Sequence, residues 1–244
     1  MYISKSRLLL YLLCPRKYKY KYIDKIEEKV GQAAQIGLNV HEYAENVAKE
    51  LQKCDDVSEE IILDVMEELY PFPIEDFETD EHAQSLYLFF VNVLINQKYN
   101  IFSIEGDIKN DKYGLRGIVD LVLEDPETKD LFIIDYKTGN VKAITQYRKE
   151  LCIYRKLIEE KYPDKNVVFG GIFFTRNASY KGFNFAESQR KGAYVTEEDY
   201  NAVFELVEFV RQQIQEEYFP PFFNDYSSCK FCDYKDNCKA DGGR

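Results

Sequence analysis

The chain has 244 residues, 45% of them hydrophobic and 31% charged, which is the composition of a folded protein large enough for one main core. No apolar run approaches the roughly 18 residues needed to cross a membrane, and no export signal is recognisable at the N-terminus. We therefore expect a soluble, cytoplasmic protein without a membrane partner. In a reducing compartment, its six cysteines are better suited to holding a metal than to forming a disulfide framework.

The formal net charge of −11 is unevenly distributed along the chain. Residues 42–82 carry 15 acidic residues and 2 lysines, a net charge of −13, so the rest of the chain has a net charge of +2. Residues 1–29 carry 8 basic and 3 acidic residues, with tyrosines and lysines alternating in "KYKYKY". Such a stretch could hold phosphates and stack bases, or it could be a solvated helix end. The composition leaves both interpretations open.

The first hundred residues predict a helical region. Ser4 or Ser6 could cap a short helix that ends near Pro15, because proline cannot continue a helix interior. Helical spacing of apolar residues then covers three further stretches, 32–53, 58–70 and 80–99.

From residue 101 the pattern changes to that of a sheet. Three strands are expected in succession, over 101–108, 113–124 and 130–139. A helix at 142–161, a strand at 166–175, a basic loop at 175–194 and a long helix at 196–217 follow. This order predicts an α/β fold with a mixed central sheet flanked by helices.

The second and third strands carry acidic residues at one place. If the turn "DPETK" closes with its centre between Glu127 and Thr128, Asp120 lies directly opposite Asp135, and Lys137 shares a face with Asp135. Like charges placed opposite each other destabilise a hairpin, and bound Mg²⁺ or Mn²⁺ would reverse that effect.

Glu105, at the end of the preceding strand, would supply a third carboxylate. Gly117 and Gly139 bracket the acidic pair and would let a backbone or a ligand approach closely. The alternative interpretation of these residues is a hairpin with exposed acids and a surface ion pair.

These strands carry a family resemblance. The segment "GIVDLVLEDPETKDLFIIDYKTG" resembles the core of the PD-(D/E)XK nuclease superfamily, in particular its RecB-like exonuclease branch, whose fold is restriction-endonuclease-like. The resemblance implies that Asp120 and Asp135 are metal ligands, that Lys137 is the catalytic lysine and that Glu105 is the Glu often found before the Gly-x-x-Asp strand. "GLNVHEYAE" resembles the Gly-x-x-x-His-Glu element of this branch, which makes His41 another metal ligand. Taken alone, a histidine in a helix is more often a packed or solvated residue than a metal ligand.

Further positions are implied to contact DNA. The branch has a Gln-x-x-x-Tyr element after the lysine strand, and this chain has Glu150 and Tyr154 there, with Gln146 one helical turn earlier as a substitute for the glutamine. In the basic N-terminal stretch, Arg16 and Lys17 are expected to guide a DNA strand.

The cysteines at the C-terminus form the pattern C-x2-C-x5-C, made of Cys229, Cys232 and Cys238. The tail has no histidine, so a metal centre there needs a distant fourth ligand. The candidates are Cys14, Cys54 and Cys152. "LLYLLCPRKYKYKY" resembles the N-terminal Cys-Pro-Arg element of RecB-like nucleases that hold a four-iron (4Fe-4S) cluster, which implies Cys14. A zinc ion bound by four cysteines is the alternative.

Together these features predict three parts: a helical region at 1–100, a nuclease core at 101–218 and a cysteine-rich tail at 219–244 that completes the cluster with Cys14. The expected function is that of a metal-dependent DNA nuclease acting on single-stranded or end-bearing DNA. Relatives of this kind include AddB-type and CRISPR-associated Cas family four nucleases, so a protein partner in a CRISPR adaptation or recombination complex is considered. The alternative is a non-catalytic DNA-binding or assembly subunit that keeps the fold.

Overall fold

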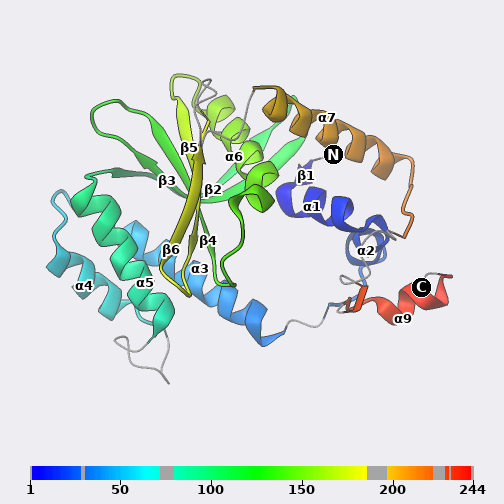
Figure 1. The fold of residues 1–244 in the computed structure, drawn as a ribbon, viewed down its shortest axis with the longest axis horizontal. Helices are drawn as coiled ribbons and strands as arrows, with labels where there is room; N and C mark the ends of the chain where they lie inside the picture. Colours follow the sequence, from blue (N-terminus) through cyan, green and yellow to red (C-terminus); the bar gives the residue numbers. More distant parts are fainter. Residues whose placement is uncertain are drawn as a thin grey trace.

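The computed structural model describes residues 2–28, 31–71, 80–185, 197–221, 229–230 and 232–242. Its centre is a six-stranded sheet of β1 (Ile3–Ser4), β2 (Asn100–Asn110), β3 (Leu115–Glu124), β4 (Leu131–Lys137), β5 (Val167–Phe174) and β6 (Ser179–Asn184). Strand β3 runs antiparallel to β2 and to β4, β5 is parallel to β4, and β6 returns antiparallel to β5. The predicted mixed sheet is confirmed (Figure 1).

Strand β3 has two partners along one of its edges. β4 pairs with its C-terminal half, from Leu121↔Ile134 to Glu124↔Leu131. β1 pairs with its N-terminal end, at Leu115 and Arg116, and runs parallel to it. Residues 117–120 therefore lie between two pairing segments, in a gap along this edge. Such gaps leave room for side chains to converge from several elements.

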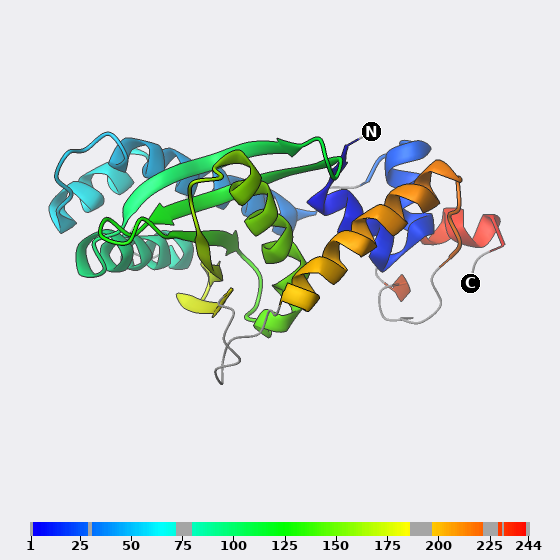
Figure 2. The same ribbon diagram turned by 90° about the horizontal axis from the view of Figure 1, so that it is seen from above.

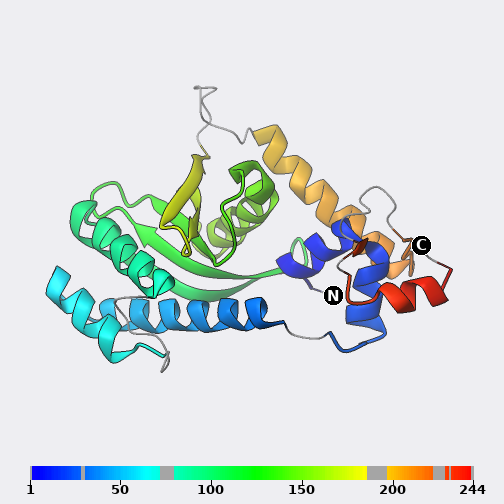
Figure 3. The ribbon, with the colours of Figure 1, turned by 60° about the horizontal axis from the view of Figure 1, so that its bottom comes forward.

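Helices cover both faces of the sheet. One face is packed by α3 (Gln32–Leu51), α4 (Glu59–Glu68) and α5 (Glu81–Phe90), which continues as a π-helical turn over Val91–Asn96. The other face is packed by α1 (Lys5–Leu13), α6 (Arg148–Lys161) and α7 (Glu197–Gln215). Figure 3 shows α3 running along the sheet on the side away from α6 and α7.

The ends of the chain lie together at one end of the elongated molecule. The helix α2 (Pro15–Tyr18), a π-helical turn at Lys19–Ile23 and the C-terminal α9 (Lys235–Ala240) gather there, as Figure 2 shows. Tyr20 donates a hydrogen bond to Asp241 Oδ2 at 2.7 Å, and Arg16 donates to the Asp241 carbonyl at 3.0 Å. These contacts join segments more than 220 residues apart in sequence.

Local signals account for most element boundaries. Ser4 caps α1 by accepting a hydrogen bond from the Arg7 amide, and Ser58 and Asp80 cap α4 and α5 in the same way. The predicted helices at 32–53 and 196–217 agree with α3 and α7 to within two residues. Within the described residues, no helix combines the length and apolarity needed to span a bilayer.

Two expectations about the elements were wrong. The segment 175–194 was expected to be a loop, but its described part contains β6, which pairs with β5 from Phe174↔Ser179 to Phe169↔Asn184; residues 186–194 lie outside the described residues. The helix expected from 142 begins at Arg148, after a 3-10 turn at Ile144–Tyr147. The division of the chain into three parts stays a prediction.

Candidate active site

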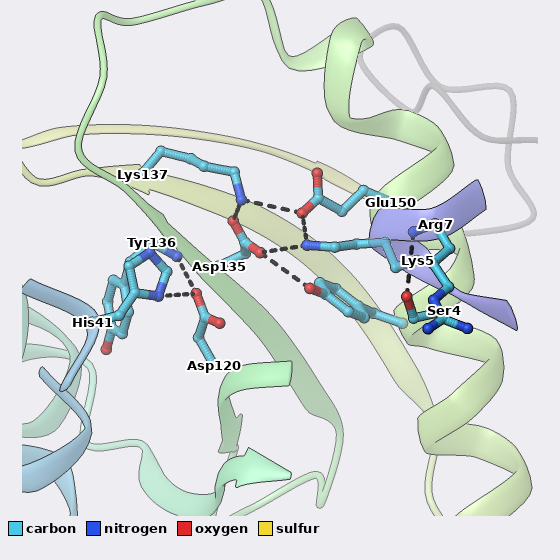
Figure 4. Close-up of polar contacts among 10 residues, drawn as sticks. Ser4, Lys5, Arg7, His41, Asp120, Asp135, Tyr136, Lys137 and Glu150 are labelled. Carbon is cyan, nitrogen blue, oxygen red and sulfur yellow. Dashed lines mark hydrogen bonds and ion pairs between the residues drawn. The ribbon is translucent and has the colours of Figure 1, made fainter. Parts of the chain in front are cut away.

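Three side chains from three elements come together at the gap beside β3. His41 of α3, Glu105 of β2 and Asp120 of β3 each offer a ligand atom, and these atoms all lie within 4.8 Å of one another. His41 Nδ1 is 3.3 Å from Asp120 Oδ2, which also accepts a 2.8 Å hydrogen bond from the Tyr136 amide (Figure 4). We call these three residues the His41 group. Its mixture of carboxylate and imidazole ligands suits a divalent cation.

The backbone of β2 is unusual at this place. Glu105 has a φ of 42°, in the left-handed region that non-glycine residues rarely adopt. The pairs Ile104↔Leu121 and Gly106↔Val119 on either side put Glu105 across from Asp120. Strained backbone of this kind is often kept at functional sites, because the surrounding pairs hold it in place.

The His41 group carries excess negative charge. Burial, followed by the nearby charges of Asp120 and Glu45, raises the pKa of Glu105 to about 7. For His41, burial lowers the pKa, but the hydrogen bond to Asp120 and the charges of Asp120 and Asp135 outweigh it, so its pKa is raised overall. A bound cation would compensate this charge.

A second set of charged residues lies next to the His41 group. Lys137 contacts Asp135 and lies 3.1 Å from Glu150 Oε1. Lys5 of α1 contacts Glu150 and lies 3.7 Å from Asp135. We call these four residues the lysine network. Burial lowers the pKa of Lys137, but the charges of Asp135 and Glu150 outweigh burial and raise it well above its usual value, so its ammonium stays protonated.

The predicted register of the β3–β4 hairpin was right, but its consequence for the site was not. The pairs Leu121↔Ile134 and Glu124↔Leu131 have the register that was expected to place Asp120 opposite Asp135. The ladder ends at Leu121, however, and the two carboxylates then take different partners, His41 for one and two lysines for the other. Asp135 is therefore not part of the His41 group.

The two glycines have different roles. A Cβ on Gly117 would come within 2.6 Å of Leu157 Cδ1, so this glycine permits close packing of α6 on β3 rather than approach of a ligand. Gly139 faces open space, with nothing within 4 Å of an added Cβ.

The residues of the helix after β4 that were expected to contact DNA differ in exposure. Gln146 is exposed in the 3-10 turn before α6. Glu150 is buried in the lysine network, and the Tyr154 hydroxyl is 3.3 Å from Asp135 Oδ1. Lys5, by contrast, was missed, because the two-residue strand that positions it has no periodicity to detect. The Ser4 cap was the one available signal that this helix begins at Lys5.

An open groove of about 940 Å³ adjoins both sets of residues. Its walls include the whole His41 group together with basic and aromatic side chains, namely Lys5, Arg7, Lys109, Arg116, Tyr2 and Tyr22. Basic groups mixed with aromatic rings are suited to a phosphate backbone with unstacked bases.

Comparison with known proteins decides the family. The model of the PD-(D/E)XK nuclease superfamily matches residues 2–239, almost the whole chain. This chain belongs to that superfamily. The chain is 25% identical over 240 residues to the DNA replication ATP-dependent helicase/nuclease DNA2 of Saccharomyces cerevisiae, a match that covers 83% of this chain and 16% of the relative. The chain thus spans about a sixth of that relative's length.

A solved structure shares the fold. The crystal structure of a protein from Eubacterium rectale, provisionally named an exonuclease, superimposes with a TM-score of 0.53 at 12% sequence identity. The match covers 97% of this chain and 87% of that protein's chain.

Four of the six cysteines meet at the end of the molecule where the termini gather. Cys14, Cys229, Cys232 and Cys238 line one small pocket, together with Arg16 and Lys17. Burial raises the pKa of the Cys238 thiol, Arg16 opposes this, and the three other cysteines add to the rise. Cys14 also caps α2 by accepting a hydrogen bond from the Lys17 amide. Four thiols around one pocket form a donor set that fits a zinc ion or an iron–sulfur cluster.

Proposed function

We propose that this chain is a metal-dependent deoxyribonuclease that hydrolyses phosphodiester bonds in single-stranded or end-bearing DNA. The observation that carries the proposal is the His41 group, whose three ligand atoms lie within 4.8 Å of one another beside the ion-paired Lys137. The residues fit Mg²⁺ or Mn²⁺, because both prefer carboxylate oxygen and Mn²⁺ also accepts imidazole.

In this proposal His41, Glu105 and Asp120 hold the cation, and Asp135 adds a carboxylate from the neighbouring strand. When bound, the cation would activate a water and offset charge on the scissile phosphate. Lys137 Nζ has three N–H donors, two of which are directed at Asp135 and Glu150. The third can orient the attacking water or donate to a phosphate oxygen.

The groove supports DNA as the substrate. Arg7, Lys109 and Arg116 line it next to the His41 group, where a phosphate backbone would contact them. The yeast relative is named as a helicase/nuclease of DNA replication, which also supports DNA as the substrate. Because the groove is also lined by acidic residues, binding should depend on both metal and salt.

For the cysteines we propose a structural 4Fe-4S cluster held by Cys14, Cys229, Cys232 and Cys238. The four thiols line one pocket, which also suits zinc. The resemblance of the Cys14-Pro15-Arg16 element to that of RecB-like nucleases that hold a four-iron cluster supports the cluster over zinc. Iron, sulfide and zinc analysis of anaerobically purified protein tests this: zinc without iron would refute it.

The test of the nuclease is cleavage of end-labelled single- and double-stranded DNA with Mn²⁺, with Mg²⁺ and with EDTA. We expect metal-dependent degradation by the wild-type chain and a loss of about 10²-fold or more in the Lys137→Ala variant. Lys5 continues to pair with both carboxylates in that variant, so the variant should remain folded.

The polarity of cleavage follows from the product ladder of substrates labelled at one end. An absence of cleavage by folded, metal-loaded protein that still binds DNA would favour the assembly-subunit alternative instead. A pull-down against recombination or CRISPR adaptation proteins would then be the next experiment.

A further inference from the structure

Lys5 occupies a place in the site that the proposed chemistry does not use. It follows β1 directly and is the first residue of α1, so its backbone is held on one side by pairing with β3 and on the other by the Ser4 cap. Its ammonium contacts Glu150, lies 3.7 Å from Asp135 and stands 4.9 Å from the centre of the Tyr154 ring. The side chain is 19% exposed and lines the groove.

The charges around Lys5 explain why a second lysine is needed. The carboxylate side chains of Asp135 and Glu150 are only 1% and 7% exposed, so each requires a compensating charge close by. Lys137 reaches both carboxylates but carries only one positive charge. Without Lys5, the two carboxylates and Lys137 would keep one negative charge that no group of the lysine network compensates.

We propose that Lys5 is a positioning residue of the active site: it neutralises Glu150 and thereby keeps Lys137 and Asp135 in place for the reaction. This inference rests on the proposed nuclease function and deepens it. Lys5 acts through Glu150, so removing the carboxylate charge should remove the need for the lysine.

The edge of β3 explains how an N-terminal residue arrives there. β1 pairs with Leu115 and Arg116, and β4 pairs with β3 from Leu121 onward. Lys5 emerges from β1 at the start of the intervening gap, and Asp135 and Lys137 lie at the end of β4 (Figure 4). The pairing of β1 with β3 therefore directs Lys5 into the gap, in addition to the reach of its long side chain.

The test is a double-mutant cycle of Lys5→Met and Glu150→Gln. We expect Lys5→Met to lower kcat for DNA cleavage by about tenfold or more, and the double variant to recover to within about threefold of wild type, because its remaining pair of Asp135 and Lys137 is again neutral. Lys165→Met is the matched control: it removes a lysine from the similar Lys165–Glu124 pair at the other end of the hairpin and should leave kcat unchanged.

Binding of Mn²⁺, measured by titration calorimetry, checks the charge balance without cleavage. Lys5→Met leaves one extra negative charge and should bind Mn²⁺ several-fold more tightly. Glu150→Gln should bind it several-fold more weakly, and the double variant should match wild type. If the chain shows this pattern but leaves DNA intact, the nuclease proposal fails and the role of Lys5 stands.

Two results would overturn the inference. One is a Lys5→Met variant with wild-type kcat and Mn²⁺ affinity. The other is a double variant no better than Lys5→Met, which would mean that Lys5 acts on DNA directly. If Lys5→Met alone does not fold, a folded and active double variant still supports the inference, and an unfolded one refutes it.

Discussion

The His41 group and the lysine network lie side by side on the same strands, yet their charges are compensated in opposite ways. Asp135 and Glu150 are buried and form ion pairs with two ammonium groups of the chain, those of Lys5 and Lys137. Asp120 meets a histidine and a backbone amide, and the pKa of Glu105 rises to about 7 because burial and Asp120 disfavour its charge. The charges of the lysine network are thus compensated within the chain, whereas the His41 group keeps an excess of negative charge that a cation would compensate.

This difference suggests a division of labour. The lysine network holds its groups in place before any metal arrives, because removing either partner of a buried ion pair is costly. The His41 group stays poised for a cation, because its own charges repel. Variants of the lysine network should therefore act mainly on the rate, with changes in Mn²⁺ affinity of only several-fold. Variants of the His41 group should act mainly through loss of the cation.

The largest expected effect comes from Asp120→Asn, which removes a ligand charge but keeps the size of the side chain and an acceptor for the Tyr136 amide. Cation stabilisation of several kcal/mol corresponds to a loss of about 10³-fold in cleavage. Without metal, the melting temperature should stay the same or rise. The reason is that Asp120→Asn removes the charge that repels Glu105 and raises the pKa of its carboxyl.

Asp64→Asn, on the exposed face of α4, is the control for the loss of one acid and should behave as wild type. An Asp120→Asn variant that cleaves at the wild-type rate at every metal concentration would contradict the assignment of the cation to the His41 group.

A smaller effect is expected from His41→Asn, which tests whether the His41 group and the lysine network have separate roles. It should raise the Mn²⁺ concentration needed for half-maximal cleavage by about tenfold, with the rate recovering at saturating Mn²⁺. Lys137→Ala should do the reverse and lose rate without weakening Mn²⁺ binding. Metal titrations of both variants measure this. A rate loss in His41→Asn that excess Mn²⁺ does not restore would contradict the separate roles of the His41 group and the lysine network.

Much of the fold was predictable because its signals are local. Apolar periodicity identified α3 and α7, and strand patterns identified β2 to β5. β1 and β6 were not predicted, for different reasons. β1 has only two residues and depends on its partner Leu115. β6 is a polar edge strand, and its sequence lacks the apolar–polar alternation that would have predicted its pairing with β5.

The site was predictable in its membership but not in its arrangement. His41, Glu105 and Asp120 were assigned through the resemblance to the family's motifs, and the structure brings them together. Spacing did not reveal that Asp120 and Asp135 take different partners, because that depends on where the β3–β4 ladder ends. Nor did it reveal that Glu150 pairs with Lys5, a contact across 145 residues that no local pattern encodes.

The smallest effect is expected from Tyr154→Phe, which probes how the lysine network holds Asp135. Burial and the charges of Asp135 and Glu150 raise the pKa of Tyr154 well above its usual range, so the hydroxyl keeps its proton and donates toward Asp135. Phenylalanine preserves the packing of the ring and loses one hydrogen bond of about 1 kcal/mol, which corresponds to about a fivefold lower kcat. The KM for DNA should not change, because in this structure the hydroxyl is buried against Asp135. A higher KM with an unchanged kcat would instead assign Tyr154 to DNA contact, and the lysine network would then hold Asp135 by its ammonium groups alone.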